Sequence, residues 1–580
     1  MRSIKQYWQE DRIFLLFWML LQAILGWGDR IWMGPYGMHQ GAQADRAGVA
    51  WNFYHETWNL FLPRVMENRA AEGIAGMEFP IISYAVGMIW RAFGHHDVIY
   101  RLTVGVIVTI GYWSLWRFLG RLGIVGIGRV AVILLVFLSP IMVFYTWNFL
   151  PDAAALGLSF AGLYRWFRWR MDNENTENKF DGIWVCLLFS LSGLVKVSML
   201  IPFFSILCIE LLQSNTARRW RNFFVKPKWR VANSEYGETI VLEDENETNN
   251  RGTTRFHGAT ILELLSVYGG VLLLVLAWYM YSGWLTSSTW NIHFIQQVNP
   301  VNSMDELKDV LRFISNVWSD SIFYGSALFW LIVLWAISLI RKSGMFEIWD
   351  WLSVFNFLGF ISFFLLFSKQ FRFHDYYFLS AWPFVFTAVL VIFRSQLQGR
   401  RIFVGFSGIV AVVFFVYYPI RGIGHSSKML NYRLQSGNYY CQNIIVNEQG
   451  LTAIGDWLNT KEDPLVTKEI LVIGDPSPST ALYYLQRKGL RFAPDFDSIS
   501  CRGIWNKRKE LEEGIANRAL EWKWPWDFRY GKNRKLGYVV AQKNYIDTLN
   551  ISSYIVDIKH DKNLIYSSGD WNLYEIKNSN

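Results

Sequence analysis

Long apolar segments recur along most of the chain, and they constrain its fold more than any other feature. A helix of roughly 17 to 25 apolar residues suffices to cross a bilayer. Candidate segments are 13–28, 99–117, 129–147, 151–168, 182–195, 199–212, 262–283, 322–340, 349–367, 377–393 and 402–420. A chain of 580 residues that is 52% hydrophobic and patterned in this way is not a single soluble domain. We predict a polytopic α-helical membrane protein with about 11 to 13 transmembrane helices.

The orientation follows from the basic residues, which leave the chain with a net charge of +9. In a soluble protein this charge would indicate nucleic-acid binding, but here it gathers in short loops between apolar segments. These loops are 117–129, 165–179, 341–342 and 394–401. Because the positive-inside rule places such loops in the cytoplasm, we expect an inner or plasma membrane protein without a nucleic-acid partner.

The same rule assigns the other loops to the outer face, which is periplasmic or extracellular. They are residues 29–79, the turn near Lys196, the loop 284–321, the turn 368–376 and everything after 420. The N-terminus is then cytoplasmic. Segment 13–28 follows basic residues and lacks a small-residue cleavage site after it, so we interpret it as an anchor.

Segment 80–93 is shorter than a membrane span. We interpret it as a helix that enters and returns on the outer side or lies along it. The alternative makes it cross and merges 182–212 into one span. It ranks second because it puts Arg117, Arg121 and Arg129 outside.

Two regions differ from the apolar segments. The insert 213–260 opens with a basic stretch and closes with an acidic one, which indicates a cytoplasmic loop against anionic headgroups. Residues 421–580 predict a soluble α/β domain on the outer face, with a helix at LTAIGDWLN, strands at EILVIGD and LGYVVAQK, and a terminal strand pair from YIVDIK onward. Cys441 and Cys501 lie in this domain, and whether they pair stays open.

The stretch from Gln43 to Gly94 is polar and aromatic, yet it lies between apolar segments. Asp45 heads a segment whose apolar residues have helical spacing. A Gly-rich turn then leads to Glu78, directly before the next apolar run. An acid beside a bilayer is costly without a role, so both carboxylates are candidate functional groups.

The strings QAD, AWNFY and MEFPIISY, in this order, resemble the first external loop of the family 39 glycosyltransferases of the GT-C superfamily. That family includes protein O-mannosyltransferases and lipid A aminoarabinose transferases. The resemblance implies a transmembrane catalytic domain at 1–420, with 29–79 as its external catalytic loop. The chain departs from it twice. Many relatives have a second acid where this chain has Arg46, and the aminoarabinose branch has a Lys where this chain has Phe79.

The resemblance implies that Asp45 is the catalytic carboxylate. It places a second acid near the site, Asp152, although this position after a Pro also suits a helix N-cap or first-turn acid. It places a Lys that faces the lipid phosphate, here Lys196 between two apolar halves. The alternative for Lys196 is a side chain that snorkels to a headgroup.

The stretch KQFRFHDYYFLSAWP brings a group of polar side chains into one outer turn, and they are Arg372, His374, Asp375, Tyr376 and Tyr377. Aromatic residues suit an interfacial belt, but the charges beside them favour a substrate-binding site. HDYYF followed by a Pro resembles a family motif whose Tyr touches the donor phosphate, and Tyr377 aligns with it.

A divalent metal ion is a further expectation from the resemblance. In the aminoarabinose branch an acid that matches Glu78 and a loop His hold a metal ion, and His293 is the candidate for this His. No nucleotide cofactor is expected, because a polyprenyl phosphate-linked sugar is already activated.

These residues predict a membrane glycosyltransferase, a hexosyl or pentosyl transferase. It would move a sugar from a polyprenyl phosphate-linked donor to a hydroxyl of a protein, lipid or cell-envelope glycan on the outer face. Asp45 would act as general base, and Lys196, Tyr377 and Arg372 would neutralise charge on the departing phosphate. Direct attack by the acceptor would invert the anomeric centre.

Two other classes stay open. A transporter or lipid flippase also has many spans and intramembrane charges, although here the acids gather on one face and no inverted repeat is visible. A noncatalytic envelope scaffold would explain the departures at Arg46 and Phe79.

Reporter fusions test the predicted orientation. A reporter that is active only outside the cytoplasm should give signal when fused after Tyr440 and none when fused after Asn233, because the charge bias puts these positions on opposite faces. Signal after Asn233 would overturn the topology.

Overall fold

The computed structural model describes the parts of the chain that carry the fold and most of the predicted site. The described residues are 4–67, 71–171, 180–213, 229–234, 237–242, 260–289, 294, 298–340, 346–372, 374–397, 406–435, 448–462, 469–475, 480–492, 536–543 and 564–575. The predicted metal ligand His293, Cys441, Cys501 and the strand expected at 554–559 lie outside these ranges.

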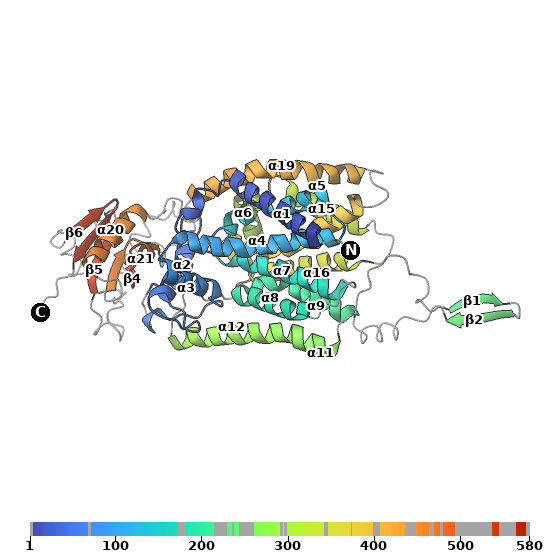
Figure 1. The fold of residues 1–580 in the computed structure, drawn as a ribbon, viewed down its shortest axis with the longest axis horizontal. Coiled ribbons are helices and arrows are strands. Elements are labelled where there is room, and N and C mark those ends of the chain that lie inside the picture. The colour runs from blue at the N-terminus through green and yellow to red at the C-terminus, as the bar shows by residue number, and fades with distance from the viewer. Residues whose placement is uncertain are drawn as a thin grey trace.

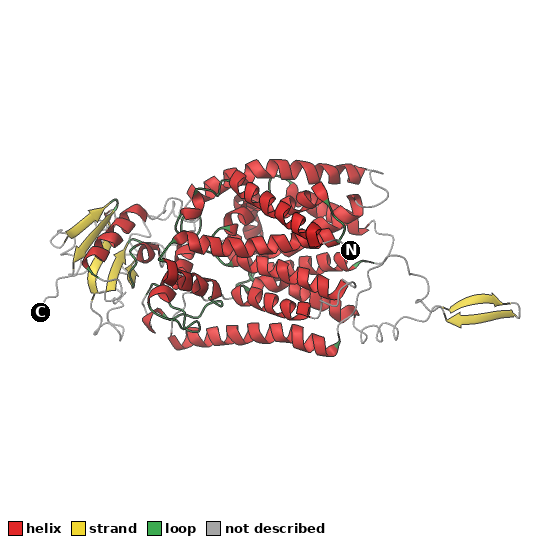
Figure 2. Ribbon diagram, viewed as in Figure 1, coloured by secondary structure: helices red, strands yellow, loops and turns green. Residues whose placement is uncertain are grey.

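Most of the described chain forms one elongated helical bundle (Figures 1 and 2). Its helices are α1 (Ile4–Leu25), α4 (Asp97–Arg121), α5 (Gly126–Phe137), α6 (Pro140–Thr146), α7 (Asp152–Met171), α8 (Asp181–Val195), η4 (Val197–Leu200), α9 (Ile201–Gln213), α12 (Gly269–Thr289), α13 (Met304–Phe313), α14 (Ser319–Ile322), α15 (Ala327–Ile340), α16 (Ile348–Leu366), η7 (Asp375–Ala381), α18 (Trp382–Ile392) and α19 (Phe406–Gln435).

Five of the described helices are long and apolar enough to cross a membrane, or up to seven if each of two bent pairs counts as one span. This supports a multi-pass membrane protein, whereas the predicted total of about 11 to 13 helices stays a prediction. The expected spans at 182–195 and 199–212 correspond to the shorter helices α8 and α9, which the break at Lys196 separates.

α2 (Gln40–His55) and α3 (Ile81–Phe93) lie together at one end of the bundle (Figure 1). They approach closely at Gly87, where a Cβ would lie 2.7 Å from the Phe53 side chain and 2.8 Å from the Ala50 carbonyl. α3 has 13 residues, so it covers only about 20 Å, less than the apolar core of a bilayer. The length agrees with the preferred interpretation of segment 80–93.

A mixed sheet of five strands follows the bundle, in the order β4-β3-β5-β7-β6. β3 is parallel to β4 and β5, and β7 is antiparallel to β5 and β6. The elements are α20 (Glu448–Lys461), β3 (Glu469–Ile473), α21 (Thr480–Tyr484), β4 (Gly489–Phe492), β5 (Leu536–Gln542), β6 (Leu564–Ser568) and β7 (Trp571–Glu575). The helix and the two strands expected at 451–459, 469–475 and 536–543 are therefore present.

The sheet docks on the end of the bundle that holds α2 and α3 (Figure 1). Tyr483 donates to Asp97 at the start of α4, and the Tyr484 hydroxyl donates to the Pro35 carbonyl at 2.6 Å. Lys488 Nζ donates to Glu56 Oε2, the C-cap of α2, at 2.5 Å. The strands β1 (Trp229–Ser234) and β2 (Gly237–Leu242) of the insert lie at the opposite end. This arrangement is the one that the predicted topology requires, and which end faces the cytoplasm stays a prediction.

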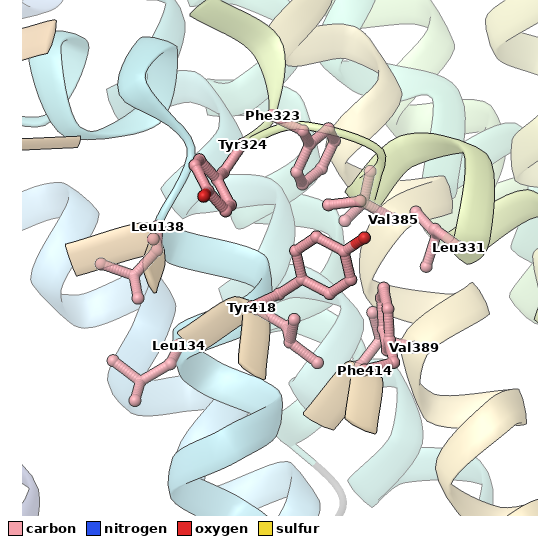
Figure 3. Close-up of a pocket in the computed structure, with 12 residues that line it drawn as sticks. Leu134, Leu138, Phe323, Tyr324, Leu331, Val385, Val389, Phe414 and Tyr418 are labelled. Atoms are coloured by element: carbon pink, nitrogen blue, oxygen red, sulfur yellow. The ribbon is translucent and has the colours of Figure 1, made fainter. Parts of the chain in front are cut away.

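Two sharp bends interrupt the bundle near its apolar groove (Figure 3). The α5–α6 pair bends by 85° and the pair 304–322 and 327–340 by 91°. Carbonyls freed at these bends need donors. The Ser139 hydroxyl donates to the Ile322 carbonyl at 2.5 Å, and the Ser426 hydroxyl donates to the Leu138 carbonyl at 2.9 Å. Aliphatic and aromatic side chains line the groove, including Leu134, Val385 and Phe414.

Asp375 is the centre of a fully buried polar network that joins four parts of the chain. Its Oδ1 accepts hydrogen bonds from the Tyr145 hydroxyl at 2.6 Å and lies 3.0 Å from His39 Nε2, and its Oδ2 pairs with Arg433 near the end of α19. The Arg433 carbonyl accepts from the Met38 amide at 2.8 Å. The network therefore fixes the entry to α2 against η7, α6 and α19.

Replacement of Arg433 by Met tests this network. The change leaves the Asp375 carboxylate without its cation in a fully buried place, and breaking a buried ion pair costs about 3–5 kcal/mol. We expect a clear fall in the thermal unfolding temperature of the detergent-solubilised protein. The matched control is Arg421→Met, an exposed arginine on the same helix, which should change stability by less than about 0.5 kcal/mol. Equal effects of the two variants would contradict a structural role for the buried pair.

Candidate functional site

Asp45 and Arg46 lie in the second turn of α2, and both are nearly buried, with 9% and 8% of their surface exposed. The start of the helix is held by Gln43, whose Nε2 donates to the carbonyls of Tyr36 and Met38 at 2.8 Å each. The Arg46 carbonyl accepts a hydrogen bond from the Ser83 hydroxyl of α3 at 3.2 Å. These contacts fix both residues where the loop before α2 meets α3.

Glu78 lies in the loop before α3, which α12 holds in place. Trp278 Nε1 and the Ser282 hydroxyl donate to the Met77 carbonyl at 3.0 and 2.9 Å. Gly76 has no room for a side chain, because a Cβ would lie 2.1 Å from the Ser282 carbonyl oxygen. In this position Glu78 Oε1 accepts a hydrogen bond from Arg46 Nη2 at 2.6 Å, and both side chains are buried.

Asp152 and Lys196 form a second buried pair. Asp152 occupies the first turn of α7, where an acid also favours the helix dipole, and Lys196 has extended backbone between α8 and η4. Lys196 Nζ lies 3.5 Å from Asp152 Oδ1, and the two residues are 4% and 1% exposed. The ammonium also lies 5.5 Å from the ring centres of Tyr376 and Tyr377. Lys196 therefore points into the protein, which excludes the snorkelling alternative.

These two pairs belong to one group of charges, which we call the charged cluster: Asp45, Arg46, Glu78, Asp152 and Lys196. Asp45, Glu78 and Asp152 all lie near enough to act electrostatically on Arg46. Glu78, Asp152 and Arg46 likewise act on Lys196. The residues come from α2, the loop before α3, α7 and the break after α8, so the fold gathers predicted site residues that are far apart in sequence.

The turn before α18 contributes an aromatic wall to the charged cluster. The ring of Tyr377 stacks on Phe363 at 5.8 Å, and the His374 ring lies 5.2 Å from Tyr376 and 5.8 Å from Tyr377. Among the residues that the structure describes, His374 Nδ1 has no hydrogen-bond partner. Tyr376, Tyr377 and His374 therefore lie where a ligand of Lys196 would contact them.

Two other predicted substrate-binding residues are directed elsewhere. Both carboxylate oxygens of Asp375 contact other side chains, namely Tyr145, His39 and Arg433. Asp375 therefore stabilises the turn through contacts with the protein. The Arg372 guanidinium lies 5.2 Å from the ring centre of Phe313 in α13. Binding of substrate by these two residues stays a prediction.

The expected metal ion does not fit Glu78 as this residue lies in the structure. Its carboxylate already accepts a hydrogen bond from Arg46, and the guanidinium carbon lies 4.4 Å from the ring centre of Phe294. A metal cation bound to Glu78 would lie next to the Arg46 guanidinium and be repelled by its positive charge. In the described ranges, no three side chains of His, Cys, Asp or Glu gather as metal ligands would, and His293 lies outside those ranges.

Sequence reasoning missed several residues of this region. Tyr279 of α12 is close enough for Glu78, Asp152 and Arg46 to act on it, but one Tyr in an aromatic-rich apolar segment carries no signal. His39 and Arg433 contact Asp375 in the structure. They are far from Asp375 or unremarkable in sequence, so no local pattern predicts these contacts. Arg46 did carry a signal, because a basic residue directly after the candidate catalytic acid departs from the family pattern.

No protein-family model matches the sequence, and no curated protein is similar to it in sequence. Solved structures are similar in fold. ArnT from Cupriavidus metallidurans in the apo state matches with a TM-score of 0.51 and 10% identity over 99% of this chain and 98% of that chain. The same protein bound to undecaprenyl phosphate matches with a TM-score of 0.53 and 11% identity over 97% of this chain and 98% of that chain.

An oligosaccharyltransferase from Archaeoglobus fulgidus in the apo form has a TM-score of 0.49 and 12% identity over 92% of this chain and 70% of that chain. ArnT is a lipid A aminoarabinose transferase and belongs, like the oligosaccharyltransferase, to the GT-C superfamily. At such low identity the likeness to ArnT shows a shared fold. The chain therefore has the GT-C fold that the sequence motifs predict.

A double-variant series tests the pairing of Asp152 with Lys196. Lys196→Met leaves Asp152 as an unpaired buried charge, which should cost about 3–5 kcal/mol of stability. Removing both charges in Lys196→Met with Asp152→Asn should restore most of that loss, because replacing a whole buried pair is often neutral. Lys428→Met, an exposed lysine of α19, serves as the control. If the double variant melts as early as the single one in detergent, the two side chains do not depend on each other.

Proposed function

We propose that this protein is a membrane glycosyltransferase that moves a sugar from a polyprenyl phosphate-linked donor to an acceptor hydroxyl. One observation carries the proposal: three carboxylates and two cations from four parts of the chain meet in one buried cluster, at the bundle end that also holds α2, α3 and the docked sheet. The GT-C fold supports it. One of the similar structures, ArnT, is bound to undecaprenyl phosphate, which agrees with a lipid phosphate donor.

The cations suit the phosphate of such a donor. Lys196 is buried beside Tyr376 and Tyr377, so a phosphate placed there would contact an ammonium and two phenol groups. Positive charge in a place shielded from water stabilises negative charge that develops on the departing phosphate. The donor carries its own activation, so no nucleotide is needed.

Among the three acids of the charged cluster, Asp45 is the best candidate for the general base. Glu78 is hydrogen-bonded to Arg46 at 2.6 Å and Asp152 lies 3.5 Å from Lys196, so each of these two carboxylates already positions a cation of the cluster. Asp45 is also the most exposed of the three, at 9% against 5% for Glu78 and 1% for Asp152. A base near the surface can reach an acceptor hydroxyl and later release its proton to water.

The proposed transfer needs only the acceptor hydroxyl, the lipid-linked donor and the side chains of the charged cluster. The acceptor oxygen forms a bond to the anomeric carbon while its proton passes to Asp45. The bond from that carbon to the phosphate oxygen breaks, and its electron pair leaves with the polyprenyl phosphate. Attack from the face opposite the leaving group inverts the anomeric centre. Asp152 keeps Lys196 in place during this step. A site at the outer membrane face would give it access to proteins, lipids or glycans of the cell envelope.

Asp45→Asn tests the general base. The amide keeps the size and polarity of the side chain but cannot accept the proton, so sugar transfer should fall by about 10²- to 10⁴-fold while folding and donor binding persist. Transfer is measured with purified protein, a radiolabelled polyprenyl phosphate sugar and crude envelope acceptor. Asp29→Asn, an exposed acid of the same external segment, is the matched control and should retain wild-type transfer.

The outcomes of this assay separate the candidate classes. Wild-type transfer by Asp45→Asn would remove this residue from the mechanism. No transfer by the wild type with any donor would favour a flippase or a noncatalytic scaffold.

A further inference from the structure

The Arg46 guanidinium is the least satisfied cation of the charged cluster. Its Nη2 donates to Glu78 at 2.6 Å, but Nε and Nη1 are buried and have no hydrogen-bond partner in the part of the chain that the structure describes. Buried donors in folded proteins are almost always bonded. Two such donors on one rigid, permanently charged group indicate an acceptor that comes from a ligand.

The surroundings of Arg46 hold the guanidinium still. Glu78 bonds one nitrogen, the Phe294 ring covers the group at 4.4 Å, and Ser83 bonds the Arg46 carbonyl at 3.2 Å. Ser83 is fixed in turn by the Tyr100 hydroxyl at 2.9 Å. These contacts therefore hold the two remaining nitrogens in fixed positions, as a designed anion site does.

An anionic oxygen is the acceptor that fits. A guanidinium N–H donates a strong, charge-assisted hydrogen bond to a phosphate or carboxylate oxygen, and the group keeps its charge at any working pH. The carboxylates nearby already have cations, since Glu78 bonds Arg46 through Nη2 and Asp152 faces Lys196. A phosphate between Arg46 and Lys196 would give one of the unmatched donors of Arg46 an acceptor and bring Lys196 a second anion.

The same contact disfavours a metal ion at Glu78. A divalent cation binds carboxylate oxygen at about 2.0–2.6 Å, and the Glu78 oxygen already has the Arg46 nitrogen at 2.6 Å. Bound there, the ion would lie against a fixed positive charge. Displacing the guanidinium would break its contacts with both Phe294 and Glu78.

We infer that Arg46 takes the place of a divalent metal ion in this enzyme and donates a hydrogen bond from one of its two remaining nitrogens, Nε or Nη1, to the phosphate of the lipid-linked donor. The inference rests on the proposed function, since it assigns the donor phosphate to a residue of that site. Lipid phosphate binding and sugar transfer by this chain then require no metal.

Binding of undecaprenyl phosphate to the purified full-length protein is the test, because it needs no sugar transfer. The wild type should bind this probe equally well, within about two-fold, before and after treatment with EDTA. Arg46→Gln should weaken binding at least about 10-fold, and Arg46→Lys should recover part of it, because the ammonium keeps the charge but lacks the planar, fixed donor geometry of the guanidinium. Arg64→Gln, a partly exposed arginine of the same external segment that pairs with Glu56 and Glu72, is the control and should bind like wild type.

Metal analysis of the wild type is the second arm and does not depend on any variant folding. Stoichiometric zinc, manganese or magnesium that EDTA removes together with lipid binding would overturn the inference. Unchanged binding by Arg46→Gln would overturn it as well, while leaving the proposed function intact. If the wild type itself binds no undecaprenyl phosphate under any condition, the proposed polyprenyl phosphate donor fails instead.

Discussion

Burial of charge in an apolar bundle is the constraint on which the rest of this structure depends. An isolated charge in such a place is too costly to persist, so each one requires a partner. Arg46 has Glu78, Lys196 has Asp152, and Arg433 has Asp375. Each partner comes from a different element, so the ion pairs also determine how the helices sit against one another. The chemistry of the site and the packing of the bundle are thus set by the same contacts.

α2 shows the consequence most clearly, because both of its ends are fastened by distant parts of the chain. At the start, His39 contacts Asp375, which Arg433 of α19 holds. At the end, Glu56 contacts Lys488 beside β4, and Arg91 of α3 donates to the Phe53 carbonyl at 2.8 Å. The docked sheet therefore supports the helix that carries Asp45. Burial lowers the pKa of His95 at this docking surface, against the opposing charge of Asp97.

Local patterns in the sequence predicted the elements and the positions of single site residues, but not their partners. Apolar runs predicted the helices, and motifs picked out Asp45, Glu78, Asp152, Lys196 and Tyr377 as candidate site residues, whose roles stay predictions. Hydropathy could not predict that 126–146 bends by 85°, because a bent apolar segment has the composition of a straight one. Nor could it pair Arg46 with Glu78 or His39 with Asp375, since such contacts depend on how helices pack over long sequence separations. Asp375 was expected to bind substrate, yet the fold supplies it with three protein partners.

The two departures from the family pattern make sense together once the structure is known. Where the aminoarabinose branch has a Lys after the acid that matches Glu78, this chain has Phe79, whose ring packs on Trp278 at 4.8 Å. In this chain the cation beside Glu78 comes from the neighbouring helix, where Arg46 donates to Glu78. An arginine in place of a second acid would weaken a metal site, and an apolar ring in place of a lysine would weaken a phosphate site. This cation belongs to the protein itself, and its contacts with Glu78 and Phe294 hold it in place.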